Sequence, residues 1–261
     1  MKTIAILFSL CLTPAWAASN WGMPLVGVAR DAKNLIHPVY GVAGSFILRG
    51  ALSGEAVNWA FAASGGLVEM DGELQVLDAH ANVTGRRAAP PGGAVLSPGY
   101  AFFAATGELW PAGARAGGST MIEPAAIAGR VMALGPADQR GIIVAACRAS
   151  QLWLLTFDVK KGTLMRESAP GGALGEEACA GGGVLLVLRD GILVAAAREI
   201  VIQTAQGNER RVPIPVDHGA KIHRAGEDTV QIELPGSPSR IMRITADGEK
   251  MYELPAAEAR P

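Results

Sequence analysis

The stretch SRIMRITADGEKMYELP, residues 239–255, alternates apolar and polar side chains on both sides of the pair Asp247-Gly248. A period of two predicts half-buried strands, and an Asp-Gly pair between two such runs predicts the turn of a β-hairpin. The stretch REIVIQTAQGNERRVPIP has the same pattern, and aligning Ile200 with Ile241 also aligns a Thr, an Ala and a Gly in each copy. The hairpin is therefore interpreted as a repeated unit.

Four earlier segments resemble this hairpin more loosely, which brings the number of copies to six. The strand starts are Leu25, Leu74, Leu109, Leu152, Ile200 and Ile241. A glycine follows each of the first five starts after 19 or 20 residues, namely Gly44, Gly93, Gly129, Gly172 and Gly219. A nearly constant block followed by a block of variable length indicates a repeated supersecondary unit.

The variable blocks contain further candidate strands, such as VNWAFAA with GLVEMD, YAFFAAT, GIIVAAC, VLLVL with ILVAAA, and TVQIEL. Two short strands before each hairpin give four strands in about 42 residues, the size of a β-propeller blade. The sequence thus predicts an all-β propeller of five to six four-stranded blades. Counting leaves two arrangements open, five blades with an added hairpin or six blades with one incomplete; a tandem β-sandwich is the alternative fold.

Two short stretches resemble repeats of known propeller families. LWLLTFDVKKGT is similar to the outer-strand repeat of quinoprotein-type propellers, in which an apolar strand leads to Asp, a Lys-rich turn and Gly. IMRITADGEKMYELP resembles hairpins of the NHL and gluconolactonase or streptogramin-lyase-like propellers. The resemblance implies a propeller architecture and no particular activity. Quinone binding is not implied, because the chain is too short for the usual blade number of quinoproteins and lacks their repeated Trp positions.

The first 17 residues have the pattern of a secretory signal peptide, with Lys2, an apolar run over 4–12 and the small-residue pattern Ala15-Trp16-Ala17. The apolar run is too short for a helix that spans a membrane, which needs about 20 residues. We therefore expect no membrane span and a secreted or periplasmic mature chain, 18–261, that forms one propeller-like domain.

The charge balance restricts the classes of binding partner, and the cysteine content indicates whether a disulfide can form. Without Lys2, 22 of the 23 Lys and Arg residues remain against 24 Asp and Glu residues, so there is no excess of positive charge for binding nucleic acid. Cys147 and Cys179 both remain after removal of the signal peptide. In an oxidising compartment they are candidates for a disulfide, with two buried thiols as the alternative.

Catalytic motifs are absent from the sequence: it contains no G-x-S-x-G, H-E-x-x-H, C-x-x-C or P-loop pattern. The segment DHGAKIH places Asp217, His218 and His223 near one another, and imidazoles with a carboxylate can bind a transition metal. On one strand His218 and His223 would point to opposite faces, so convergence needs a bend at Gly219. Solvent-exposed loop histidines are the preferred interpretation.

Propeller sites gather polar side chains on loops at the innermost strands, around the central channel. The residues expected nearest those loops are Asn58, Glu123, Asp138, Glu176, Glu177, Asp217 and His218. Any two carboxylates among them could form a pair with shifted pKa values, or they could simply hydrate loop tips. The two longest variable blocks, after Gly44 and around Glu176-Glu177, are the first places to expect a binding surface.

These observations predict a secreted or periplasmic, non-catalytic propeller without a cofactor that binds a protein, a glycan or a small molecule. Two alternatives stay open. One is a propeller hydrolase or lyase with a divalent metal in the central channel. The other is a structural component of a cell-envelope complex.

Overall fold

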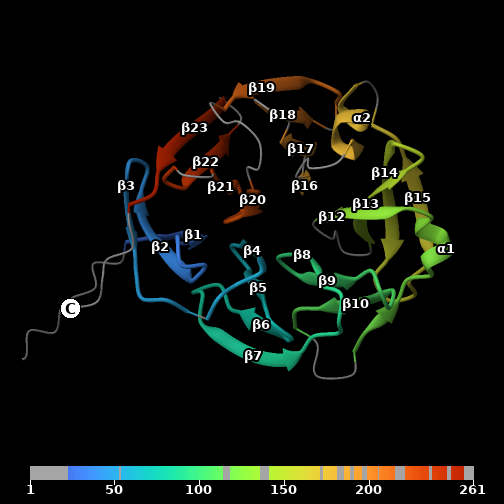
Figure 1. Cartoon of the computed structure of the whole chain (residues 1–261), viewed down its shortest axis with the longest axis horizontal. Helices are drawn as coiled ribbons and strands as arrows, with labels where there is room; N and C mark the ends of the chain where they lie inside the picture. Colours follow the sequence, from blue (N-terminus) through green and yellow to red (C-terminus); the bar gives the residue numbers. More distant parts are fainter. Residues whose placement is uncertain are drawn as a thin grey trace, which may run out of the picture.

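The computed structural model describes residues 23–52, 54–113, 118–135, 141–170, 173–180, 185–188, 191–195, 199–204, 206–214, 221–234, 237–245 and 248–255. Their strands form six antiparallel sheets, arranged as blades around a central axis (Figure 1). The fold is therefore a six-bladed β-propeller. The predicted propeller is confirmed, and the tandem β-sandwich is wrong.

Five blades have four strands each, which follow one another in chain order from the centre to the rim. Blade 2 contains β4 (Asn58–Ala62), β5 (Gly65–Met70), β6 (Glu73–Leu77) and β7 (Val83–Ala88). Blade 3 contains β8 (Val95–Ser97), β9 (Tyr100–Phe103), β10 (Glu108–Pro111) and β11 (Thr120–Met121). Blade 4 contains β12 (Arg130–Leu134), β13 (Gly141–Arg148), β14 (Gln151–Asp158) and β15 (Leu164–Ser168).

The last two blades keep this order. Blade 5 contains β16 (Leu185–Leu188), β17 (Gly191–Ala195), β18 (Glu199–Thr204) and β19 (Glu209–Pro213). Blade 6 contains β20 (Lys221–Arg224), β21 (Thr229–Glu233), β22 (Arg240–Thr245) and β23 (Gly248–Glu253). The segments of the variable blocks that were predicted as strands lie in the inner two strands of blades 2 to 6.

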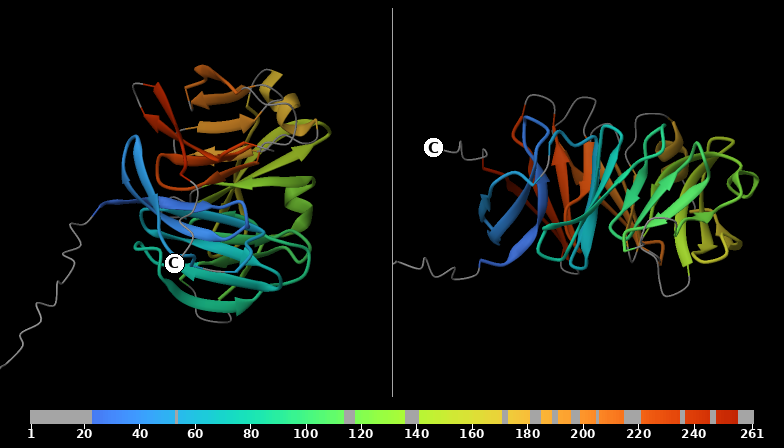
Figure 2. Two further views of the ribbon diagram at one scale, coloured as in Figure 1. Left: turned by 60° about the vertical axis from the view of Figure 1, so that its left-hand side comes forward. Right: turned by 90° about the horizontal axis from the view of Figure 1, so that it is seen from below.

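Blade 1 has three described strands, β1 (Leu25–Arg30), β2 (Ile36–Val42) and β3 (Ser45–Leu48). It lies between blade 6 and blade 2, which Figure 2 shows from two further sides. Its β1 runs beside β21 in the same direction, since the Val28 N–H donates to the Ala225 carbonyl before β21 and Arg30 contacts Glu233 at its end. The innermost strands β4 and β20 contact each other directly. Blade 1 therefore begins at the position of a second strand, and its described part has no innermost strand.

This arrangement corrects one part of the predicted repeat. The segment from Leu25 was predicted as an outer hairpin, but it forms β1 and β2, the inner pair of blade 1. Gly44 accordingly lies in the turn between β2 and β3, with φ of 87°, and not after an outer hairpin. The other five hairpins do form the third and fourth strands of their blades. Asp31 accepts backbone N–H groups in the β1–β2 turn as Asp78 and Asp158 do in the turns of two outer hairpins, and this likeness explains the misalignment.

Apolar clusters fill the spaces between neighbouring blades. Phe102 and Leu109 of blade 3 pack with Ile142, Leu155 and Phe157 of blade 4 in one such cluster. Ala, Val, Leu and Ile predominate in the others, in keeping with the high apolar fraction of the sequence. Burial of both faces of each sheet by its neighbours is what makes a short four-stranded sheet stable in a propeller.

Two short helices, which were not predicted, connect the rim of one blade to the centre of the next. The first, α1 (Pro124–Ile127), begins with Pro at a position where a missing N–H costs nothing. The second, α2 (Ala173–Cys179), follows β15, and a disulfide joins its Cys179 to Cys147 of β13. In the part of the chain that the structure describes, no helix is long and apolar enough to cross a membrane.

Candidate functional site

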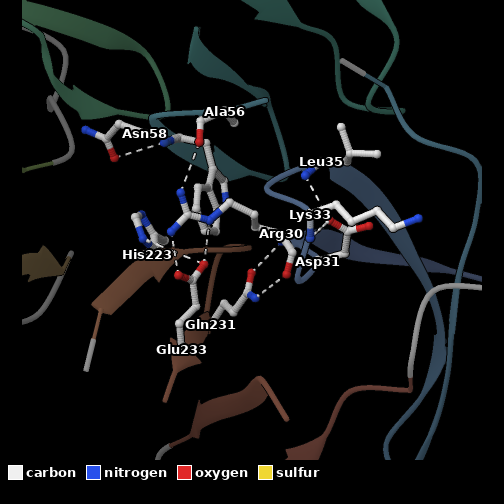
Figure 3. A network of polar contacts seen from close by, with 10 residues as sticks. Arg30, Asp31, Lys33, Leu35, Ala56, Asn58, His223, Gln231 and Glu233 are labelled. Atoms are coloured by element: carbon white, nitrogen blue, oxygen red, sulfur yellow. Dashed lines mark hydrogen bonds and ion pairs between the residues drawn. The ribbon is translucent and has the colours of Figure 1, made fainter. Parts of the chain in front are cut away.

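A network of polar contacts joins blades 1, 2 and 6 near the centre of the propeller (Figure 3). The guanidinium of Arg30 at the end of β1 donates from Nε to Oε1 of Glu233 at 2.9 Å and from Nη2 to Oε2 at 2.5 Å. Its Nη1 donates to the carbonyl oxygen of Ala56, just before β4, at 3.0 Å. Only 5% of Arg30 is exposed. One buried cation therefore holds the ends of two strands and the entry to a third.

Gln231 on β21 supplies hydrogen bonds that a neighbouring strand would otherwise give to β1. Its Oε1 accepts the backbone N–H of Arg30 at 2.7 Å, and its Nε2 donates to the carbonyl oxygen of Arg30 at 2.8 Å. Gln231 is fully buried. Because a buried backbone group without a partner is costly, this amide explains how β1 can end beside the centre without an inner strand.

Trp59 of β4 and His223 of β20 stack in the same network, with ring centroids 3.6 Å apart and an angle of 15° between the rings. The guanidinium carbon of Arg30 lies 5.0 Å from the Trp59 ring centroid. Burial, and then the positive charges of Arg30 and Lys221, lower the pKa of His223 well below its ordinary value. The ring is therefore neutral at neutral pH and offers an uncharged surface to Trp59.

This position corrects the prediction for His223. It was interpreted as a solvent-exposed loop histidine, yet it lies on an innermost strand and only 11% of its side chain is exposed. Its Nε2 atom is 3.9 Å from Oε1 of Glu233, beyond hydrogen-bond distance. Asp217 and His218 lie outside the described residues.

The turn between β1 and β2 is held by Asp31. Its Oδ1 accepts the backbone N–H groups of Lys33 at 2.8 Å and Leu35 at 2.9 Å, and its Oδ2 lies 3.0 Å from Nε2 of His37. Burial alone raises the pKa of Asp31, but the Leu35 N–H, the His37 ring and the Lys33 N–H outweigh it, so the pKa is lowered overall. The carboxylate is thus charged, and both of its oxygens have partners in the turn or in β2.

A cleft of about 800 Å³ opens above this network, on the face where the innermost strands begin. We call this face the upper face and the hollow the upper cleft. The residues that line the upper cleft come from the β1–β2 turn, the end of β3, the β21–β22 connection and the end of β23. They are Arg30, Asp31, Ala32, Lys33, Asn34, Leu48, Glu233, Leu234, Ser237, Pro238, Ser239, Glu253, Leu254 and Pro255.

The upper cleft combines apolar walls with an ionic rim. Leu48, Leu234 and Leu254 are buried in its walls, whereas Lys33 and Glu253 are exposed at its edge. The described lining contains no aromatic side chain. Chemically, such a surface can hold an extended ligand with small apolar groups and charges of both signs.

Asn58 is the predicted site residue that the structure brings to an innermost strand. Its Nδ2 donates to the carbonyl oxygen of Ala94 at 3.1 Å, and its Oδ1 accepts the N–H of Trp59 at 2.9 Å. Glu69, beside it on β5, accepts the N–H of Ala94 at 2.8 Å. Burial raises the pKa of Glu69, an effect that the Ala94 N–H partly offsets. These side chains join blade 2 to blade 3.

The other predicted residues do not meet in the described structure. Glu123 precedes α1 and Glu176 lies within α2, and both are exposed on connections outside the Arg30 network. Asp138 lies outside the described residues, as does the side chain of Glu177. Among the residues that are described, no group of three or more His, Cys, Asp or Glu side chains is placed to hold a metal ion. As binding residues, all seven candidates stay predictions.

The residues that build the network, apart from His223 and Asn58, were not candidate site residues from the sequence. The available signal was a polar side chain inside or at the end of an apolar run, as with Gln231 in TVQIEL and Arg30 after LVGVA. Such residues are rarely buried unless they have partners. The partner, however, lies 201 residues away for the Arg30–Gln231 contact, and no local pattern identifies it.

No protein-family model matches the chain, and no curated protein matches it. Among solved structures, a protein of unknown function from Bacteroides caccae is 11% identical with a TM-score of 0.50, and the match covers 89% of this chain and 92% of that one. PorZ from Porphyromonas gingivalis, described as an essential bacterial surface component of the type-IX secretion system, is 11% identical with a TM-score of 0.46. That match covers 90% of this chain and 34% of PorZ, so the chain spans about a third of PorZ.

A third structure, the β-propeller domain of Cps50 (Swd1) from Myceliophteria thermophila, is 12% identical with a TM-score of 0.43. The match covers 74% of this chain and 67% of that domain. At such low identity, likeness is restricted to the fold.

Proposed function

We propose that the chain is an exported, non-catalytic propeller that binds an extended polypeptide segment of a partner protein in the upper cleft. The observation that carries the proposal is the cleft itself, whose volume of about 800 Å³ is in the range of ligand sites. Its floor is the rigid Arg30–Glu233 pair, and its rim is formed by short loops. Binding surfaces of propellers and other scaffolds commonly lie on loops that rigid strands position.

A binding role is favoured over catalysis because the polar groups at the floor of the cleft are already hydrogen-bonded to other groups of the protein. The guanidinium of Arg30 is hydrogen-bonded to Glu233 and Ala56, and both carboxylate oxygens of Glu233 accept from Arg30. Asp31 holds its own turn. A general acid or base needs an atom within hydrogen-bond reach of substrate, whereas these side chains contribute rigidity and shape.

A polypeptide is favoured over a glycan because of the side chains along the cleft. Sugar rings bind best against exposed aromatic faces, and the described lining of the upper cleft has none. Apolar walls with the exposed charges of Lys33 and Glu253 at the edge suit alternating apolar and charged side chains of an extended peptide.

Export rests on the predicted signal peptide. The disulfide between Cys147 and Cys179 is compatible with an oxidising compartment, where such bonds persist. A partner would accordingly be another exported or cell-surface protein.

The test is selection of random short peptides on a display library against the purified mature chain, 18–261. We expect enriched sequences with apolar residues flanked by charges, whose affinity falls about tenfold or more in the variant Ser237→Arg, because a long side chain then enters the cleft. Ser237 is exposed, so this substitution leaves the core unchanged.

The matched control is Asn208→Arg, an exposed position in the β18–β19 turn on the opposite face. It should bind the selected peptides as the unmodified protein does. Peptides that are insensitive to Ser237→Arg, or a library that yields no binder while a glycan array does, would contradict the proposed polypeptide site.

A further inference from the structure

A second hollow lies on the opposite face, where the innermost strands end, again at the junction of blades 1, 2 and 6. Its volume is about 380 Å³, within the range of small-molecule sites. Its lining is mainly apolar and includes the aromatic rings of Phe46, Phe61 and Tyr252. We call it the lower pocket.

The walls of the lower pocket are fixed by packing. Phe61 is 2% and Ile241 is 1% exposed, and the rings of Phe46 and Tyr252 meet edge to face at 5.6 Å. Gly41, near the end of β2 on one side of the pocket, has a φ of 133°, and an added Cβ there would lie 2.0 Å from the carbonyl oxygen of Ser45 in β3. The β2–β3 hairpin therefore requires glycine at this position and holds a defined shape.

The rim of the lower pocket carries more negative than positive charge. Asp228 and Arg243 pair with each other, with Oδ2 and Nε 2.9 Å apart, and Oδ1 of Asp228 also accepts the Thr229 hydroxyl at 3.1 Å. Glu227 is exposed, and in the described part of the chain its carboxylate has no ion-pair partner. The buried Arg224 is within electrostatic reach of this carboxylate, so the rim offers an exposed carboxylate, outside any direct ion pair, beside aromatic rings.

We propose that the lower pocket binds a small aromatic molecule that carries a primary ammonium group. The aromatic body would pack between Phe61, Phe46 and Tyr252, where apolar area is removed from water. The ammonium group would contact the carboxylate of Glu227, and the faces of the neighbouring rings also attract a cation. This site is separate from the upper cleft and does not rest on the proposed function.

The test uses three probes that share an aromatic body and differ in the polar end: 2-(1-naphthyl)ethylammonium, 2-(1-naphthyl)ethanol and 3-(1-naphthyl)propionate. Each is titrated calorimetrically into the mature chain. We expect the ammonium probe to bind most tightly and the carboxylate probe at least about tenfold more weakly. Equal or tighter binding of the carboxylate probe would mean that Arg243, and not Glu227, determines the charge preference of the rim, and would overturn the proposal. Absence of binding by the ammonium probe would overturn it as well.

Two variants and a control locate the site. Glu227→Gln should weaken the ammonium probe about fivefold and leave the alcohol unchanged, since only the charge is removed. Ala63→Trp, at an exposed position of the lining, should abolish binding of the ammonium and alcohol probes by filling the pocket. Glu123→Gln removes the same charge far from the pocket and should have no effect. Unchanged binding in Ala63→Trp would place the probes elsewhere and overturn the proposal.

Discussion

At the scale of single residues, polar side chains between blades 1 and 6 form hydrogen bonds to the edge of β1, beside which the structure describes no further strand of blade 1. Gln231 hydrogen-bonds the open edge of β1, and Arg30 joins Glu233 to Ala56. Their position at the centre of an otherwise apolar core means that each depends on its partner. Buried polar groups of this kind stabilise only as complete sets.

Replacing Arg30 with Met should therefore be strongly destabilising, because Glu233, of which 19% is exposed, would lose its partner. Breaking such a pair costs about 3–5 kcal/mol of unfolding free energy. Urea denaturation followed by tryptophan fluorescence measures the loss. The double variant Arg30→Met with Glu233→Leu should recover part of it; a double variant as unstable as the single one would contradict this account.

His223 should make stability depend on pH. Its pKa is lowered in the folded state, so the unfolded chain takes up the proton first as pH falls below the ordinary value of 6.5. The contribution to stability is present above that value and is lost as pH falls further, by up to about 1.4 kcal/mol per pH unit.

The variant His223→Phe keeps an aromatic ring against Trp59 and does not titrate. Denaturation at a series of pH values from 7.5 to 5 should give a shallower loss of stability in the variant than in the unmodified protein. Parallel curves would show that His223 is accessible to protons in the folded state, against the burial described for it.

At the scale of elements, β1 is held close to blade 6. A Cβ atom added at Gly27 would lie 1.9 Å from the Ala225 carbonyl oxygen, closer than two non-bonded atoms can approach. Only glycine allows the first and last blades to approach this closely.

Gly27→Ala should thus force the two blades apart and lower the melting temperature by several degrees, a loss of about 2 kcal/mol or more. Gly99→Ala, in the β8–β9 turn, is the control, because an added Cβ there meets nothing within 4 Å. Differential scanning calorimetry compares the two; similar melting temperatures would mean that the close contact at Gly27 is absent in solution.

The disulfide fastens α2 to blade 4. The two cysteines are 32 residues apart in sequence, and closing such a loop stabilises a protein by about 3–4 kcal/mol in the chain-entropy model. Cys147→Ser with Cys179→Ser should lose that amount in chemical denaturation, and reduction of the unmodified protein should give the same loss. An unchanged midpoint after reduction would argue against the bond.

At the scale of the whole molecule, the repeat predicted the architecture because strand alternation and turn residues are local signals. It predicted the propeller, the strands of the variable blocks and the outer hairpins. It misassigned the segment from Leu25, since strand and turn patterns alone do not tell an inner pair of strands from an outer pair. That the described part of blade 1 has no innermost strand became visible only from the direct contact between β4 and β20.

The candidate site was harder to predict than the fold. Of the seven residues proposed from loop positions, Asn58 lies at the start of an innermost strand, while Glu123 and Glu176 lie on rim-to-centre connections. The upper cleft instead depends on contacts between the two ends of the chain, such as Arg30 with Glu233, 203 residues apart. Closure of a ring brings such residues together, and no local spacing encodes it.

A polypeptide segment that binds in the upper cleft between blades 1 and 6 should change the exchange of backbone amides there. Hydrogen–deuterium exchange of the mature chain, with and without a display-selected peptide at saturating concentration, tests it most directly. We expect protection of backbone amides in residues 31–35, at Ser237 and Ser239, and in residues 253–254, around the lining of the cleft, with little change on the opposite face. Protection restricted to the turns of the lower face, or unchanged exchange in the three segments of the cleft, would contradict it.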